Sequence, residues 1–214
     1  MAEERKPMVG QRSVKSMDAA RTASKYQKEW FLGLSDRVAN GEPFAYLNAD
    51  VPLEILRAMD IPFVVNQWWA AICSAKQMSP RYFNFLRDAG YRDDLCTYCA
   101  TAFAGSMDLE PEKGPWGGLP KPTLAITRLT CDSQGRIFEL LAKNYGAKFY
   151  PMENTIPTVV PDKWWEKAPN DWENLYQSER LDAAVEELKG LIRFLEMETG
   201  RMFDNNKLIE VMNL

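Results

Sequence analysis

The residues of this sequence best suited to chemistry are its cysteines, because the chain has four of them and no histidine. The absence of histidine excludes a Ser-His-Asp or Cys-His catalytic site and histidine-ligated zinc within this chain. Cys96 and Cys131 each stand where an apolar run gives way to an expected helix start. The N–H groups and macrodipole of a helix N-terminus favour the thiolate form, which is the form that binds metal. Two such positions on one sheet edge indicate a shared metal or cluster site.

The cysteines also allow other interpretations. Cys96 and Cys99 form a C-x-x-C pair, which is typical of a thiol–disulfide redox protein or of one half of a zinc site. A zinc site needs a second pair of this kind, and the wide separation of Cys73 and Cys131 does not provide one. Alternatively, Cys96 and Cys131 are small buried hydrophobic residues, as we expect Cys73 to be inside its apolar helix.

Composition and charge narrow the class of protein. The chain has 214 residues, of which 46% are hydrophobic and 26% charged, which is typical of a globular protein. Its net charge of -4 argues against a nucleic-acid-binding protein, which normally carries a basic face. The longest apolar runs are too short to span a bilayer, so no membrane segment is expected. The polar N-terminus has no apolar signal core, and we therefore expect a cytoplasmic protein.

Apolar runs typical of buried strands alternate with stretches of helical period. The expected strands span residues 44–47, 62–65, 123–129 and 147–151. The expected helices span residues 16–40, 51–60, 70–76, 79–90, 134–145, 176–198 and 205–214, and a further helix carries Cys96 and Cys99. This alternation predicts an α/β fold with a doubly wound, mostly parallel, Rossmann- or flavodoxin-like sheet, an N-terminal helix and C-terminal helices. The glycine- and proline-rich stretch 105–122 is expected to be a surface loop with little structure of its own.

Polar side chains follow the first two expected strands. In a doubly wound sheet, ligands bind beyond the carboxyl ends of the strands. Asn48, Asn66, Gln67 and Trp68 are therefore candidate substrate-binding residues in the same crevice as the cysteines. The alternative for Trp68 and its neighbour Trp69 is a packing role, because tryptophan buries a large area.

Several motifs, taken in order, resemble a known family. Residues 51–62, 90–98 and 130–132 are similar to the iron–sulfur subunits of 2-hydroxyacyl-CoA dehydratases and benzoyl-CoA reductases. The segments 187–200 and 205–213 resemble the helix pair that follows the first α/β domain in that family. The resemblance covers about residues 20–214.

The resemblance implies a [4Fe–4S] cluster held by three cysteines of one subunit. Cys96 and Cys131 match two of these ligands, and the third belongs to a second α/β domain that this chain lacks. Alternatively, the chain borrows a ligand, such as Cys99, a partner thiolate or a small molecule. The regions are then an arm and amphipathic helix over residues 1–42, a cluster-binding α/β domain over 43–178, and C-terminal helices over 179–214 that lead to the second domain.

The resemblance also implies partners and a reaction. An ATP-dependent activator protein delivers an electron, so ATP is used by the activator and not by this chain, and the cluster passes the electron to an acyl-CoA thioester. A related second iron–sulfur subunit completes the enzyme, and the reaction is dehydration or reduction of an aromatic ring. The aromatic segment at residues 66–69 favours a large or aromatic acyl group. The alternatives are a non-catalytic assembly or electron-transfer module of the same fold, and the thiol–disulfide redox protein.

Overall fold

The computed structural model describes residues 17–92, 96–155, 161–171 and 175–213, and the expected N-terminal arm lies outside the described residues. The described chain contains a four-stranded sheet whose strands run in the order β2-β1-β3-β4. Every pairing in this sheet is parallel. The strands are β1 (Ala45–Leu47), β2 (Phe63–Val65), β3 (Leu124–Arg128) and β4 (Lys148–Met152).

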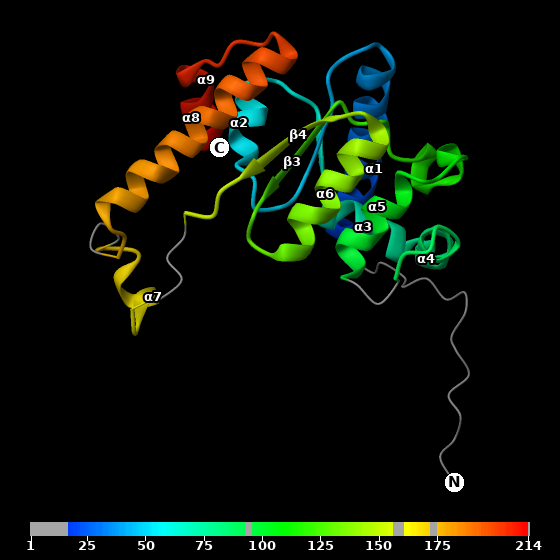
Figure 1. Ribbon diagram of the computed structural model, residues 1–214. Coiled ribbons are helices and arrows are strands. Elements are labelled where there is room, and N and C mark those ends of the chain that lie inside the picture. Colours follow the sequence, from blue (N-terminus) through cyan, green and yellow to red (C-terminus); the bar gives the residue numbers. More distant parts are fainter. Residues whose placement is uncertain (1–16, 93–95, 156–160, 172–174, 214) are drawn as a thin grey trace.

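Helices cover both faces of the sheet (Figure 1). The helices of one face are α1 (Asp18–Ala39), α3 (Asn66–Ala75), α4 (Ser79–Asp88), α5 (Thr97–Gly105) and α6 (Asp132–Tyr145). The helices of the other face are α2 (Leu53–Ala58), α8 (Ser178–Thr199) and α9 (Asn205–Met212). The short helix α7 (Trp164–Lys167) precedes α8. This arrangement confirms the predicted α/β, doubly wound fold.

Successive residues of each strand enter two different cores, because side chains alternate across a strand. Tyr46 and Ala125 pack in the core beneath α1, α3, α5 and α6, whereas Leu47 and Ile126 pack in the core beneath α2 and α8. All four side chains are fully buried. Burial on both faces is the reason that these strands read as continuous apolar runs in the sequence.

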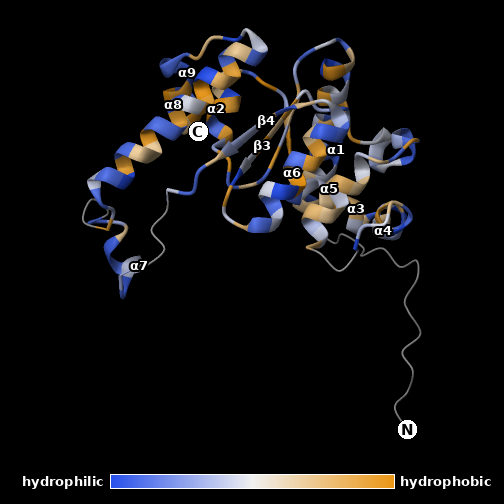
Figure 2. Ribbon diagram, viewed as in Figure 1, coloured by the Kyte–Doolittle hydropathy of each residue, from blue (hydrophilic) through white to orange (hydrophobic). Residues whose placement is uncertain are grey.

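Only a short part of each long helix, α1 and α8, is buried against the sheet. Phe31 is the fully buried anchor of α1, and its ring stacks on Trp69 with 5.1 Å between the ring centroids. Leu191 and Leu195 are the buried residues of α8. Figure 2 shows hydrophobic ribbon where α2 lies beside α8. None of the helices in the described chain is both long and apolar enough to cross a membrane.

The stretch 105–122 corrects the expectation of a loop with little structure. It contains two 3-10 helices, η1 (Pro111–Lys113) and η2 (Pro115–Gly117). Trp116 reaches back across the chain, and its ring lies 5.6 Å from that of Phe31. Gly118 has a φ of +88°, and a Cβ there would stand 1.9 Å from the carbonyl oxygen of Pro111. The glycines therefore make a compact turn that holds Trp116 against the core.

Candidate cluster-binding site

The carboxyl ends of β1 and β3 form the switch point of the sheet. The chain leaves β1 toward β2 on one side and β3 continues toward β4 on the other, so the loops after β1 and β3 diverge from adjacent strands. Ligands of doubly wound sheets bind in the crevice made by such diverging loops. Asn48 follows β1 directly, and Cys131 lies three residues beyond the end of β3, at the start of α6.

Hydrogen bonds of the Asn48 side chain join the loop after β1 to the residues after β3. Its side chain is fully buried, and its Oδ1 accepts a hydrogen bond from the backbone N–H of Arg128 at 3.0 Å. Its Nδ2 donates to Oε1 of Gln134 at 2.9 Å. The amide of Asn48 thus extends the β1–β3 pairing by one step and fixes residues on both sides of Cys131. In this position Asn48 is a positioning residue, and its contact with substrate stays a prediction.

The other loops at this edge are linked in the same way. Gln67, at the start of α3, accepts a hydrogen bond from the backbone N–H of Ala49 at 2.9 Å. The hydroxyl of Thr130 donates to Asp50 at 2.7 Å. Hydrogen bonds therefore join the loop after β1 both to the start of α3 and to the loop before α6, as the carboxyl-edge prediction requires.

Asn66 and Trp68 lie mainly inside the protein. Asn66 is fully buried and accepts a hydrogen bond from the Tyr46 hydroxyl at 2.9 Å. Trp68 is half-buried in an aromatic cluster, with its ring 5.3 Å from that of Trp30 and 6.0 Å from that of Trp116. The packing role of Trp68 and Trp69 is thus present, and a substrate-binding role of Asn66, Gln67 and Trp68 stays a prediction.

Cys96 and Cys131 occupy equivalent positions on two neighbouring helices. Cys96 is the N-cap residue of α5 and Cys131 is the N-cap residue of α6, and these helices pack against each other. Both cysteines are exposed, and neither side chain makes a capping hydrogen bond. Two thiols at helix N-termini are therefore available to an external ligand. This arrangement excludes the interpretation of both residues as buried hydrophobes.

Cys99 is the third cysteine of the site, but it faces inward. It is 1% exposed and belongs to the core beneath α5. Burial raises the pKa of its thiol to about 12, the nearby Cys96 and Cys131 act in the same direction, and the Ser133 hydroxyl opposes them. Cys73 is also buried, and burial raises its pKa to about 12. Cys73 is thus a core residue, as the sequence predicted.

The residues at this edge fit an iron–sulfur cluster as part of its ligand set. Within residues 17–92, 96–155, 161–171 and 175–213, no three histidine, cysteine or carboxylate side chains are grouped to hold a metal ion. The two exposed thiols at adjacent helix starts are the groups that would hold it. Arg128 Nε, three residues before Cys131, is buried without a hydrogen-bond partner in the described chain, whereas the Ser133 hydroxyl, two residues after Cys131, lies against the Cys99 thiol. An unpaired buried donor of this kind suits a bound anionic group.

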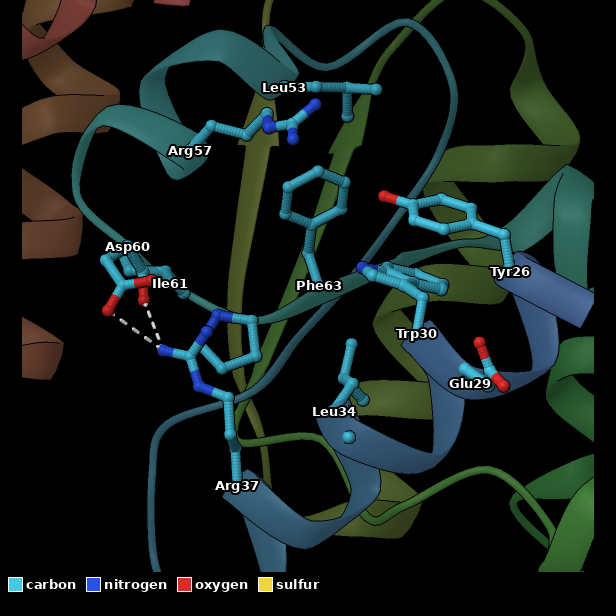
Figure 3. Close-up of a pocket in the computed structure, with 12 residues that line it drawn as sticks. Tyr26, Glu29, Trp30, Leu34, Arg37, Leu53, Arg57, Asp60, Ile61 and Phe63 are labelled. Atoms are coloured by element: carbon cyan, nitrogen blue, oxygen red, sulfur yellow. Dashed lines mark hydrogen bonds and ion pairs between the residues drawn. The ribbon is translucent and has the colours of Figure 1, made fainter. Parts of the chain in front are cut away.

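Two cavities lie outside this edge network. The first is about 460 Å³ in volume and is bordered by α3, α4 and α5, including Thr97 and Tyr98 directly after Cys96. The second is a groove of about 770 Å³ along the open edge of β2, between α1 and α2. Figure 3 shows the rings of Tyr26, Trp30 and Phe63 around this groove, with Arg37 bound to Asp60 at its end. The described residues that line this groove include no cysteine.

A family model of the "2-hydroxyglutaryl-CoA dehydratase, D-component" matches residues 48–214, which include every loop of this site. The chain belongs to this family. It is 25% identical over 177 residues to the (R)-2-hydroxyisocaproyl-CoA dehydratase alpha subunit of Clostridioides difficile. It is 23% identical over 174 residues to the (R)-phenyllactyl-CoA dehydratase alpha subunit of Clostridium sporogenes. Each alignment covers 81% of this chain and 39% of the relative, so the chain spans well under half of these relatives' length.

The match confirms the dehydratase resemblance that the sequence motifs indicated. Sequence reasoning placed Ser133 in a loop that faces the crevice but gave it no role, and it did not identify Arg128 or the cavity beside the start of α5. Ser133 has a local signal, because it follows Cys131 by two positions at a helix start. The cavity has no such signal, since three helices separated in the chain make its walls.

Proposed function

We propose that this chain is the cluster-binding part of a 2-hydroxyacyl-CoA dehydratase subunit, with Cys96 and Cys131 as ligands of a [4Fe–4S] cluster. The observation that carries the proposal is the pair of exposed, uncapped thiols at the N-termini of α5 and α6, beside the switch point of the sheet. Family membership supports the same assignment. The remaining ligand comes from outside these two residues, with Cys99 as the alternative within the chain.

When bound, such a cluster supplies one-electron transfer to the acyl-CoA thioester. The chain's own residues hold and tune it. The N–H groups of α5 and α6 stabilise the negative charge of the two thiolates. The Ser133 hydroxyl lies against the Cys99 thiol, two residues from Cys131, and would donate a hydrogen bond to a cluster sulfur. Asn48 keeps the Cys131 loop in register with β1.

The substrate and partners follow from the same assignment. The two relatives are named for acyl-CoA substrates, 2-hydroxyisocaproyl-CoA and phenyllactyl-CoA, and both are alpha subunits. We therefore propose an acyl-CoA substrate, a related second iron–sulfur subunit and an electron-delivering activator protein that hydrolyses the ATP. Dehydration is the reaction that both relatives' names give, and it is preferred here to reduction of an aromatic ring.

Iron and acid-labile sulfide content of anaerobically purified protein test the proposal, together with optical and EPR spectra. We expect bound iron and sulfide in the wild type and their loss in Cys96→Ala and Cys131→Ala. Cys73→Ala is the matched control, because Cys73 is a buried core cysteine. Iron in the wild type that persists in both Cys96→Ala and Cys131→Ala would refute these ligands, and a folded wild type free of iron would refute the cluster.

A thiol–disulfide redox function is the second candidate, because Cys96 and Cys99 lie within interaction distance of each other at the start of α5. This pair combines an exposed first cysteine with a buried second one. A thiol–disulfide function predicts a reversible two-electron titration of the Cys96–Cys99 pair in iron-free protein. It also predicts that Cys131→Ala leaves this titration unchanged, whereas the cluster-binding function predicts loss of iron in that variant.

A further inference from the structure

We propose that the cavity between α3, α4 and α5 receives the apolar side chain of the acyl group, which makes it the part of the site that selects the substrate. This inference rests on the proposed function, because it takes the acyl-CoA thioester to lie at the Cys96 edge. The cavity is lined by Ala70, Ala71, Ser74, Ala75, Ser79, Phe83, Thr97, Tyr98 and Thr101.

The location of the cavity connects it to the cluster ligand. Thr97 and Tyr98 are the first two residues of α5, and Cys96 is the N-cap of the same helix. The Cα atoms of neighbouring residues are about 3.8 Å apart, so the cavity wall begins one residue from the ligand. A thioester bound at Cys96 would thus lie one residue along the chain from the cavity between α3 and α5.

The size of the cavity suits a branched or aromatic side chain. Its volume is about 460 Å³. Ala71, Ser74 and Ala75 in its wall are exposed, so the cavity opens to solvent on this side and a ligand can enter it. The space exists because alanine and serine occupy the facing positions of α3, where larger side chains would fill it.

The chemistry of the lining favours an apolar group over the phosphates of CoA. The described residues that line the cavity include no charged side chain, and the ring of Phe83 contributes to one wall. The hydroxyl of Thr101 is already used, because it donates to the Thr97 carbonyl at 2.7 Å. By contrast, the groove in Figure 3 is lined by Glu29, Arg37, Arg57 and Asp60, which do not suit a hydrocarbon chain.

The walls of the cavity are well supported. Beneath α3 and α4, Cys73 and Tyr82 are buried, and α5 packs on α3, α4 and α6. Ala71 lies on the exposed side of α3 and lines the cavity, so a larger residue can replace it with little effect on the core. Leucine is a strong helix former, which makes Ala71→Leu a suitable filling variant.

Calorimetric titration with two CoA thioesters that lack the 2-hydroxyl group tests the proposal, because neither ligand can be dehydrated. The probes are 3-phenylpropanoyl-CoA and propanoyl-CoA. We expect wild type to prefer the phenyl compound by about tenfold or more, the order of discrimination that an apolar pocket provides. Ala71→Leu should remove this preference while propanoyl-CoA binding stays within about twofold of wild type. Ala183→Leu, at an exposed alanine of α8, is the matched control and should keep the preference.

Equal affinity of wild type for the two thioesters, or a preference that survives in Ala71→Leu, would overturn the assignment of the cavity. Iron content of the same preparations separates this failure from failure of the proposed function. Protein that binds iron through Cys96 and Cys131 but does not discriminate between the thioesters contradicts the cavity alone. Protein that discriminates through Ala71 supports the cavity, and lack of iron in it would contradict the cluster alone.

Discussion

Replacement of Asn48 with alanine tests how the cysteine loop is held. The substitution removes the hydrogen bond that Asn48 accepts from the Arg128 N–H and the one it donates to Gln134. The backbone N–H of Arg128 then loses its partner at the end of β3. The side chain of Gln134 is only half-buried, so water can replace the lost hydrogen bond and Gln134 loses less.

The expected loss in the free energy of unfolding follows from this difference between Arg128 and Gln134. A buried donor left without an acceptor costs about 1–3 kcal/mol, and a lost hydrogen bond whose partner is reached by water costs about 0.5–1.5 kcal/mol. We therefore expect Asn48→Ala to lower the free energy of unfolding by about 2–4 kcal/mol. In a domain of this size that corresponds to a fall of roughly 4–16 °C in Tm.

Thermal and urea unfolding followed by circular dichroism measure this effect. Asn40→Ala is the matched control, because Asn40 is exposed at the end of α1. We also expect Asn48→Ala to retain less iron than the control, since both lost hydrogen bonds flank Cys131. An Asn48→Ala protein as stable as Asn40→Ala would refute the reasoning, and reduced stability with full iron retention would refute the link to Cys131.

Three further predictions concern other parts of the molecule. Arg37 and Arg201 lower the pKa of Glu42 from 4.5 to about 2, so its stabilising contribution is present above pH 4.5 and is lost as pH falls toward 2. Glu42→Gln should therefore flatten the acid side of the stability profile in urea unfolding, and an unchanged profile would contradict the network. Phe31→Ala should lower the free energy of unfolding by about 3–5 kcal/mol, measured against the milder Phe31→Leu. Ser133→Ala should lower the reduction potential of the cluster in an EPR-monitored titration, because a hydrogen bond to sulfur is lost; an unchanged potential would exclude that bond.

The strands and most helices could be predicted because their determinants are local. The two central strands, β1 and β3, are apolar runs with both faces buried, and Gly146 and Gly200 end α6 and α8 in the left-handed conformation that glycine favours. The stretch 105–122 was predicted wrongly for the opposite reason. Its glycines and prolines describe the local chain, whereas its packing depends on contacts of Trp116 with Phe31 and Trp68, which are distant in sequence.

The same difference between local and long-range determinants applies to the residues of the site. Cys96 and Cys131 could be located because each stands at a helix start that the sequence pattern reveals. Asn48 was predicted at the correct edge, but as a residue that contacts substrate. Its burial depends on Arg128 and Gln134, which are 80 and 86 residues away. Local sequence therefore identifies the polar residue, while only the assembled strands determine which groups it binds.

The central place of β1 in the sheet implies an order of assembly. Its pairing with β2 closes a short segment, whereas its pairing with β3 brings together Phe44 and Thr123, which are 79 residues apart. Closing the longer loop costs more chain entropy, and such distant contacts slow folding. The unit of β1, α2 and β2 can therefore form before β3 docks, and the loops of Cys96 and Cys131 meet only after that step. A cluster held by both thiols, as proposed above, would therefore be acquired only after β3 has paired with β1.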